Sequence, residues 1–274
     1  MKKICICVCL CFAVFGYSQR KPKIKGNRAV TEEQDVLPAF NAIALNDDID
    51  VRLRKANTEG YQIVADDNLI DILKFEVLDS TLVISSYYTV TSKKKFEITI
   101  DFVEIEQIVQ NSGSIETEDF LGMDSFYLQL SGDAKFKART KAFITTLDLE
   151  EKSFADLNMD TDSLQVKLNG RSDLKLYAVS GASNFSITGS GTADVQGSTE
   201  DLNGSFFEKA RFKAEEFQAK NVGITIEDDA DARVFATDTL YLESSGKGQT
   251  YFYGDAKIIV ERFLNESQLI KKEN

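Results

Sequence analysis

The segment "SGDAKF" at residues 131–136 returns in altered form as "SGTADV" at 190–195 and as "GDAKI" at 254–258. In each copy a small residue stands two positions before an apolar residue, with a charged residue between them. Alternation of this kind is typical of a β-strand, because successive side chains of a strand point to opposite faces. The recurrence therefore predicts a chain that is built from repeated short strands.

A longer alignment extends this repeat in both directions from Phe136. Equivalent apolar residues follow at intervals of 21, 17, 21, 17, 22 and 18 residues: Leu157, Leu174, Val195, Phe212, Val234 and Phe252. The residue two positions before each of these anchors is small, and the residue ten positions before each is apolar. We predict a unit of two short strands with a tight corner between them. The corner carries a small residue in five units: Gly132, Ser153, Gly170, Gly191 and Gly248.

A unit of this length cannot bury its own apolar face, but a stack of units can. The repeat therefore predicts an all-β fold, a right-handed parallel β-helix or β-solenoid with coils of about 20 residues. An antiparallel β-sandwich is the alternative. In a solenoid the anchors should form one buried column with the small residues in a column beside it. Outward residues should then pair across coils as Lys135 with Asp156 and Asp194 with Arg211.

The N-terminus has the pattern of a secretory signal peptide. Two lysines are followed by an apolar stretch from Ile4 to Phe15, which is too short to span a bilayer, and by small residues before Gln19. We predict cleavage after residue 18, with a lipoprotein signal acylated at Cys9 or Cys11 as the alternative. All four cysteines lie in this segment, so the rest of the chain has neither thiols nor disulfides.

The composition excludes several function classes. The chain contains no histidine, which rules out histidine general bases, Ser-His triads and histidine-ligated zinc. Its net charge of −12 argues against nucleic acid and anionic membrane surfaces as partners. Together with the signal peptide, this charge predicts an extracytoplasmic protein without a transmembrane span, in the periplasm, on the outer surface or secreted.

The repeat and its flanks also predict a domain organisation. Residues 19–38 are mostly polar and charged, which predicts a flexible linker. Residues 39–270 are expected to form a single β-solenoid domain. Within it we expect a looser, irregular N-terminal β part at 39–120, regular repeats at 124–254 and a C-terminal cap at 255–270.

Several short segments resemble one bacterial family. The order "DDNL" (66–69), "STLVIS" (80–85) and "EIEQIVQNSGS" (104–114) is similar to the putative autotransporter-adhesin head GIN-domain family of extracytoplasmic proteins. The closing segment "YFYGDAKIIVERF" (251–263) also resembles that family, although Ala256 stands where proline is usual. The resemblance implies a β-solenoid-like fold at or beyond the cell envelope. It brings no catalytic, metal-binding or cofactor-binding residues with it.

Two acidic segments and the many carboxylates raise further hypotheses. "EDDADAR" (227–233) and "NDDID" (46–50) could hold Ca²⁺, but neither follows a known calcium-loop spacing, and solvated turns are the alternative. A polysaccharide-acting enzyme needs two carboxylates at a set separation, and no pair stands out. We therefore expect a protein that is not an enzyme and that uses no cofactor.

The outward positions of the last two repeat units change from charged to aromatic, at Phe235, Tyr251 and Tyr253. Aromatic rings on a rigid sheet suit stacking on sugars or packing against a protein. We therefore predict a secreted or cell-envelope binding or adhesion module whose partner is a cell-surface protein or polysaccharide. A structural or assembly role and a polysaccharide-acting enzyme are the alternatives. For the three rings, the alternative is that Ile258 to Ile270 fold back and cover them.

Overall fold

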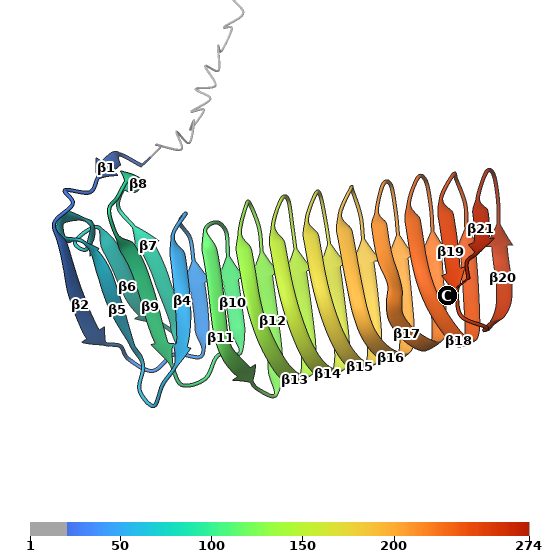
Figure 1. The fold of residues 1–274 in the computed structure, drawn as a ribbon, viewed down its shortest axis with the longest axis horizontal. Helices are drawn as coiled ribbons and strands as arrows, with labels where there is room; N and C mark the ends of the chain where they lie inside the picture. The colour runs from blue at the N-terminus through green and yellow to red at the C-terminus, as the bar shows by residue number, and fades with distance from the viewer. Residues whose placement is uncertain (1–20, 274) are drawn as a thin grey trace, which may run out of the picture.

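The computed structural model describes residues 21–273, which form an elongated stack of parallel β-coils with an antiparallel layer at its N-terminal end (Figure 1). The strands of the stack are β3 (Ala42–Leu45), β4 (Asp50–Lys55), β10 (Gln107–Gln110), β11 (Ser114–Gly122), β12 (Ser125–Leu130), β13 (Lys135–Leu149), β14 (Phe154–Leu168), β15 (Asp173–Ile187), β16 (Thr192–Phe206), β17 (Arg211–Ile226), β18 (Asp231–Ser244), β19 (Gln249–Tyr253), β20 (Lys257–Phe263) and β21 (Gln268–Lys271). The predicted β-solenoid is thereby confirmed, with about nine turns.

Each long strand contributes to two sheets, because it bends near its middle. β11 pairs with the first half of β13, and β12 pairs with the second half. We call the sheet that contains β11 and β19 sheet 1, and the sheet that contains β12 and β20 sheet 2. Alternate side chains of both sheets point inward and form one continuous apolar core. Figure 1 shows the tight corners along one long edge of the molecule and the bends along the other.

The register between coils differs from the predicted one. Phe136 pairs with Ala155, which pairs with Leu174, then Ala193 and then Phe212, so the step is 19 residues. The seven anchors are all buried, but the prediction that they form one column is wrong. A large side chain in one coil stacks on a small one in the next, and the large residues therefore alternate between two columns two positions apart. This alternation turned a 19-residue step into intervals of 21 and 17.

The corners follow the same 19-residue step. A positive φ recurs at intervals of 18 to 20 residues at nine positions: Gly113, Gly132, Glu151, Gly170, Gly189, Glu208, Asp228, Gly246 and Asn265. Gly132 and Gly170 are thus corner residues, as predicted. Gly191, Gly248 and Ser153 lie two positions after a corner residue, in a column of small residues. There Ser153 Oγ donates a hydrogen bond of 2.8 Å to the carbonyl of Glu150 and helps to close the turn.

The N-terminal segment is ordered and paired, which corrects the expectation of a flexible linker at 19–38 for the residues the structure describes. The strands at this end are β1 (Lys23–Lys25), β2 (Val30–Val36), β5 (Gly60–Asp66), β6 (Leu73–Leu78), β7 (Thr81–Ser86), β8 (Thr89–Ser92) and β9 (Phe96–Phe102), with a 3-10 turn at Asp67–Leu69. β1 pairs with β8, and β2 pairs antiparallel with β5. The side chains of β2 are exposed, so a strand held by backbone pairing at a sheet edge has the polar composition of a linker.

The rest of the N-terminal part is more regular than predicted. β3 and β10 pair in parallel with each other, as do β4 and β11, so both pairs of strands belong to the coil stack. Buried Asp66 fastens the antiparallel layer by accepting backbone hydrogen bonds from Arg28, Lys94 and Lys95. Burial by itself raises the pKa of Asp66, but these N–H groups lower it further, so its pKa lies below the ordinary value.

The C-terminal segment continues the stack and does not fold back. β20 pairs in parallel with β18, and β21 pairs in parallel with β19. Asn265 supplies the corner between β20 and β21 with a φ of 63°. The predicted cap at 255–270 is thus a final coil. Within residues 21–273 there is no helix with the length and hydropathy needed to cross a membrane. The predicted signal peptide at 1–18, with Cys9 and Cys11, lies outside the described residues, as does the cleavage site before Gln19.

Candidate functional site

Phe235, Tyr251 and Tyr253 gather on the outer face of sheet 1, near the C-terminal end. Phe235 on β18 pairs with Tyr253 on β19, and Arg233 pairs with Tyr251. All three rings are half-buried, which lies between the exposed and the covered outcomes expected from the sequence. Ile270 on β21 pairs with Tyr251, so the last coil flanks the rings and does not lie over them. We call Arg233, Phe235, Tyr251, Tyr253 and Ile270 the aromatic patch.

Basic side chains surround the ring of Tyr251. The guanidinium of Arg233 lies 5.6 Å from the ring centroid, and the Lys272 ammonium lies 5.3 Å from it. Arg233 is held in place by Glu215 at 2.9 Å, and this hydrogen bond raises the pKa of Arg233 above its ordinary value. Tyr251 in turn donates a hydrogen bond of 2.5 Å to Gln249. These contacts hold the Tyr251 ring in one orientation, with part of its surface open to solvent.

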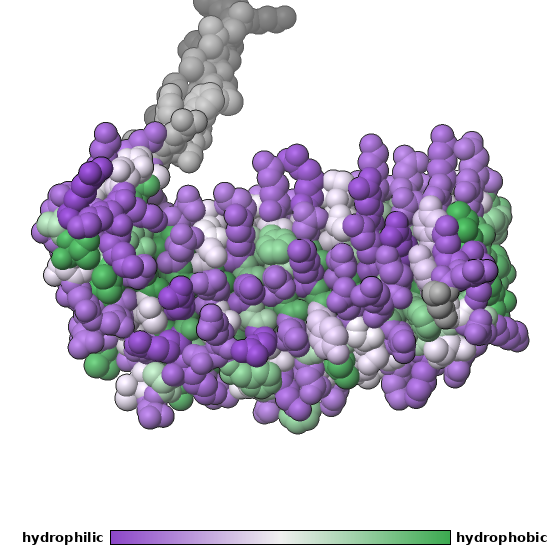
Figure 2. Space-filling model, in the orientation of Figure 1, coloured by the Kyte–Doolittle hydropathy of each residue, from purple (hydrophilic) through white to green (hydrophobic). Residues whose placement is uncertain are grey.

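The end of the stack beside this patch is apolar. Ile258 and Val260 occupy inward positions of β20, next to Leu240 and Leu242, but they are 39% and 47% exposed because β20 is the last strand of sheet 2. Figure 2 shows hydrophobic atoms gathered at this end of an otherwise largely hydrophilic surface. On sheet 1 the equivalent inward position of the last coil is Lys271, whose ammonium lies 4.4 Å from the centroid of Phe252 and bonds the carbonyl of Gly254.

Charged side chains form a ladder along the remainder of sheet 1. The predicted pairings of Lys135 with Asp156 and of Asp194 with Arg211 are wrong, because the register is shifted by two residues. The observed ladder alternates in sign from coil to coil: Arg52, Glu116, Lys137, Asp156, Lys175, Asp194 and Lys213. Opposite charges on neighbouring strands stabilise a sheet modestly and leave this face polar. The aromatic patch begins where the alternation ends, at Arg233.

The two acidic segments do not form a converging cluster of ligands. At 227–233, Glu227 binds Arg262 at 2.7 Å, and Asp231 accepts the Gln249 amide. In the other segment, Asp47 binds Lys21 at 2.5 Å and the Ser86 amide at 2.8 Å. Among residues 21–273 no group of three or more acidic side chains is arranged to hold a metal ion. These carboxylates act within the fold as partners of cations and backbone amides.

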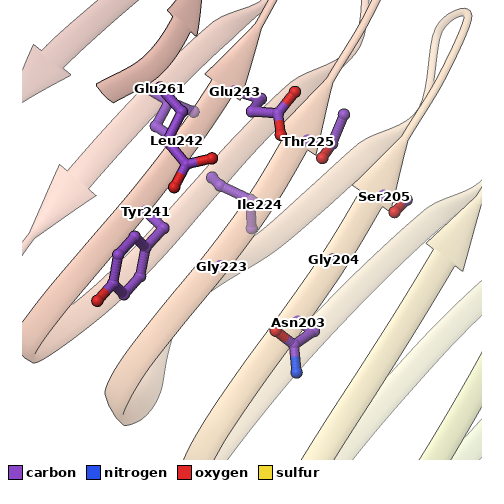
Figure 3. A pocket seen from close by; sticks show the side chains of 10 residues that line it. All are labelled: Asn203, Gly204, Ser205, Gly223, Ile224, Thr225, Tyr241, Leu242, Glu243 and Glu261. Atoms are coloured by element: carbon purple, nitrogen blue, oxygen red, sulfur yellow. The ribbon is translucent and has the colours of Figure 1, made fainter. Parts of the chain in front are cut away.

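Sheet 2 carries a hollow of about 250 Å³ that reasoning from the sequence missed. Its outward side chains come from three neighbouring coils, and Gly223 lies at its centre between Asn203 and Tyr241 (Figure 3). The predicted register did not place these three residues on one ladder, because it treated Ile224 as the neighbour of Leu202. The 19-residue step would have revealed the gap at Gly223.

The fold and these surfaces define an all-β, parallel β-solenoid with polar ladders and localised aromatic positions on its outer faces. Residues 39–256 match the family described as "Putative auto-transporter adhesin, head GIN domain", and the chain belongs to this family. The resemblance noted in the sequence is thereby confirmed. The family is described as adhesin-like and not as an enzyme.

Solved structures share the fold at low sequence identity. A putative adhesin from Parabacteroides merdae has a TM-score of 0.70 and 17% identity over 92% of this chain and 99% of its own. A putative adhesin from Parabacteroides distasonis has a TM-score of 0.68 and 17% identity over 91% of this chain and 100% of its own. A putative lipid binding protein from the same species has a TM-score of 0.52 and 17% identity over 92% and 98%. No curated protein matches the sequence.

Proposed function

We propose that this protein is an extracytoplasmic, non-enzymatic binding module that engages a cell-surface protein or polysaccharide through the aromatic patch. The single observation that carries the proposal is the grouping of Phe235, Tyr251 and Tyr253 on two neighbouring strands of one sheet face. Elsewhere on that face the outward ladder is charged. Rings that are partly open to solvent lose little conformational entropy on binding, and they gain contact area when a partner covers them.

The rigidity of the solenoid supports this role. The patch is built on strands that pair in register with their neighbours, and Arg233 and Gln249 restrain the Tyr251 ring. A binding surface on strands keeps its geometry better than one on loops. Membership of a family described as an adhesin supports an extracellular or envelope location.

The test compares binding of the purified chain to bacterial cell envelopes before and after removal of the rings. The double substitution Tyr251→Ser and Tyr253→Ser should lower binding at least tenfold. It should change the free energy of unfolding by only about 1 kcal/mol, because the lost contacts with Arg233 and Lys272 lie at the surface. Binding is measured by co-sedimentation, and stability by urea unfolding.

The matched control is Tyr177→Ser, since Tyr177 is also exposed on sheet 1 but lies in β15, away from the patch. This control should bind as the wild type does. If the double variant binds equally well, the patch is not the contact surface. If it loses several kcal/mol of stability, the rings belong to the fold and not to a binding site.

A further inference from the structure

The outward ladder of sheet 2 is interrupted at one position. In coil order the ladder runs through Gln165, Asn184, Asn203, Gly223 and Tyr241. Each of these residues except Gly223 projects a long polar or aromatic side chain. The missing side chain leaves a slot one coil wide, with the backbone of Gly223 as its floor and with Asn203 and Tyr241 as its walls (Figure 3).

The width of the slot follows from strand spacing. Neighbouring strands lie about 4.8 Å apart, so Asn203 and Tyr241 stand roughly 9 to 10 Å apart across Gly223. Van der Waals contacts on both faces of a flat ligand, at roughly 3.5 to 4.0 Å each, fill that distance with a single ring. The slot is therefore matched to one saturated or aromatic six-membered ring and is too narrow for two.

Polar groups line the rest of the hollow. The hydroxyl groups of Ser205 and Thr225 lie one outward position further along their strands, and the carboxylates of Glu243 and Glu261 lie beyond Tyr241 (Figure 3). Within residues 21–273 neither the Asn203 amide nor the Tyr241 hydroxyl has a hydrogen-bond partner on the chain. Tyr241 is 44% exposed. The slot thus combines an open aromatic ring with free donors and acceptors around it.

We propose that this slot binds one pyranose residue of a neutral polysaccharide. The C–H face of the sugar packs on the Tyr241 ring, and its hydroxyl groups bond the Asn203 amide, Ser205, Thr225 and the two carboxylates. The carboxylates repel acidic sugars. The slot lies on sheet 2, whereas the aromatic patch lies on sheet 1, so this site goes beyond the proposed function and does not depend on it.

Gly223→Thr is the decisive variant. A Cβ at Gly223 would have the side-chain oxygen of Asn203, at 3.0 Å, as its sole close neighbour, and that oxygen can move. A β-branched residue also suits a strand, so the variant should fold at least as well as the wild type. Its side chain nevertheless occupies the floor of the slot and should abolish sugar binding. The matched control is Gln165→Thr, on the same ladder three coils away.

Binding is measured by affinity electrophoresis of the full chain in native gels that contain laminarin, xylan, galactomannan or polygalacturonate. We expect at least one neutral polysaccharide to retard the wild type and Gln165→Thr. Gly223→Thr and Tyr241→Ser should lose at least tenfold in apparent affinity, and Tyr241→Phe should keep most of it. The aromatic-patch variant Tyr251→Ser with Tyr253→Ser should still be retarded, which separates this site from the proposed function. The inference is overturned if no neutral gel retards the wild type, if polygalacturonate alone does so, or if Gly223→Thr migrates like the wild type.

Discussion

Alanine residues at inward positions of sheet 1 exist because of their neighbours in the adjoining coils. Ala193 is fully buried and pairs with Leu174 on one side and with Phe212 on the other. The ring of Phe212 also packs on Phe206, with centroids 4.7 Å apart, and on Phe185 at 4.9 Å. A small residue is required where two large neighbours already fill the space between the sheets, because protein interiors are close-packed.

Ala193→Leu should therefore destabilise the protein by about 1 to 3 kcal/mol through overpacking. Asp194→Leu is the matched control, since Asp194 points outward between Lys175 and Lys213 and its loss should cost about 1 kcal/mol or less. Urea unfolding gives both values. Equal losses for the two variants would contradict the inward and outward assignment.

The corner is the element in which the coil step is visible in the backbone itself. Six of the nine corner residues and their neighbours show why glycine is useful but not obligatory there: Gly113, Gly132, Gly170, Gly189 and Gly246 have a positive φ, and Glu208 has one as well. A side chain in this conformation carries a steric cost of roughly 1 to 2 kcal/mol. At Gly170 an added Cβ would also lie 3.1 Å from the backbone of Glu151 in the preceding coil.

Gly170→Ala should accordingly lower the free energy of unfolding by about 1 to 2 kcal/mol, whereas Glu208→Gly should leave it unchanged or raise it by up to about 1 kcal/mol. Gly191→Ala is the control, because Gly191 does not adopt a positive φ and shares its column with Ala210 and Ala230. Thermal and urea unfolding measure the series. A loss at Gly191→Ala as large as that at Gly170→Ala would place the corner at the wrong residue.

The whole molecule is a nearly one-dimensional array in which each coil contacts mainly its two neighbours. The N-terminal end is covered by the antiparallel layer, with β2 pairing along β5. The C-terminal end consists of β20 and β21, which are paired on one side in the described chain and leave Ile258 and Val260 exposed. In such an array local stability falls toward an uncovered end.

Hydrogen exchange of the full chain should reflect this asymmetry. Backbone amides of β20 and β21 should exchange many times faster than those of β14, β15 and β16, which have a neighbouring coil on both sides. Mass spectrometry of peptic peptides resolves these segments. Uniform protection along the stack would indicate a single cooperative unit or a covered C-terminal end.

The sequence by itself determined the class of fold and the position of the aromatic patch. Alternating patterns and recurring small residues are local features, and the outward placement of Phe235, Tyr251 and Tyr253 follows from alternation alone. The charge-rich strand β2 was not recognised, because its pairing with β5 depends on backbone hydrogen bonds rather than on apolar side chains.

The tertiary structure alone decided the register, and with it the charge ladder and the slot at Gly223. A slip of two residues keeps every side chain on its own face of the sheet, so the inward and outward pattern cannot distinguish a 19-residue step from alternating steps of 21 and 17. The volume of the core makes the distinction. Phe136, Leu174 and Phe212 fit in one column only if Ala155 and Ala193 separate them.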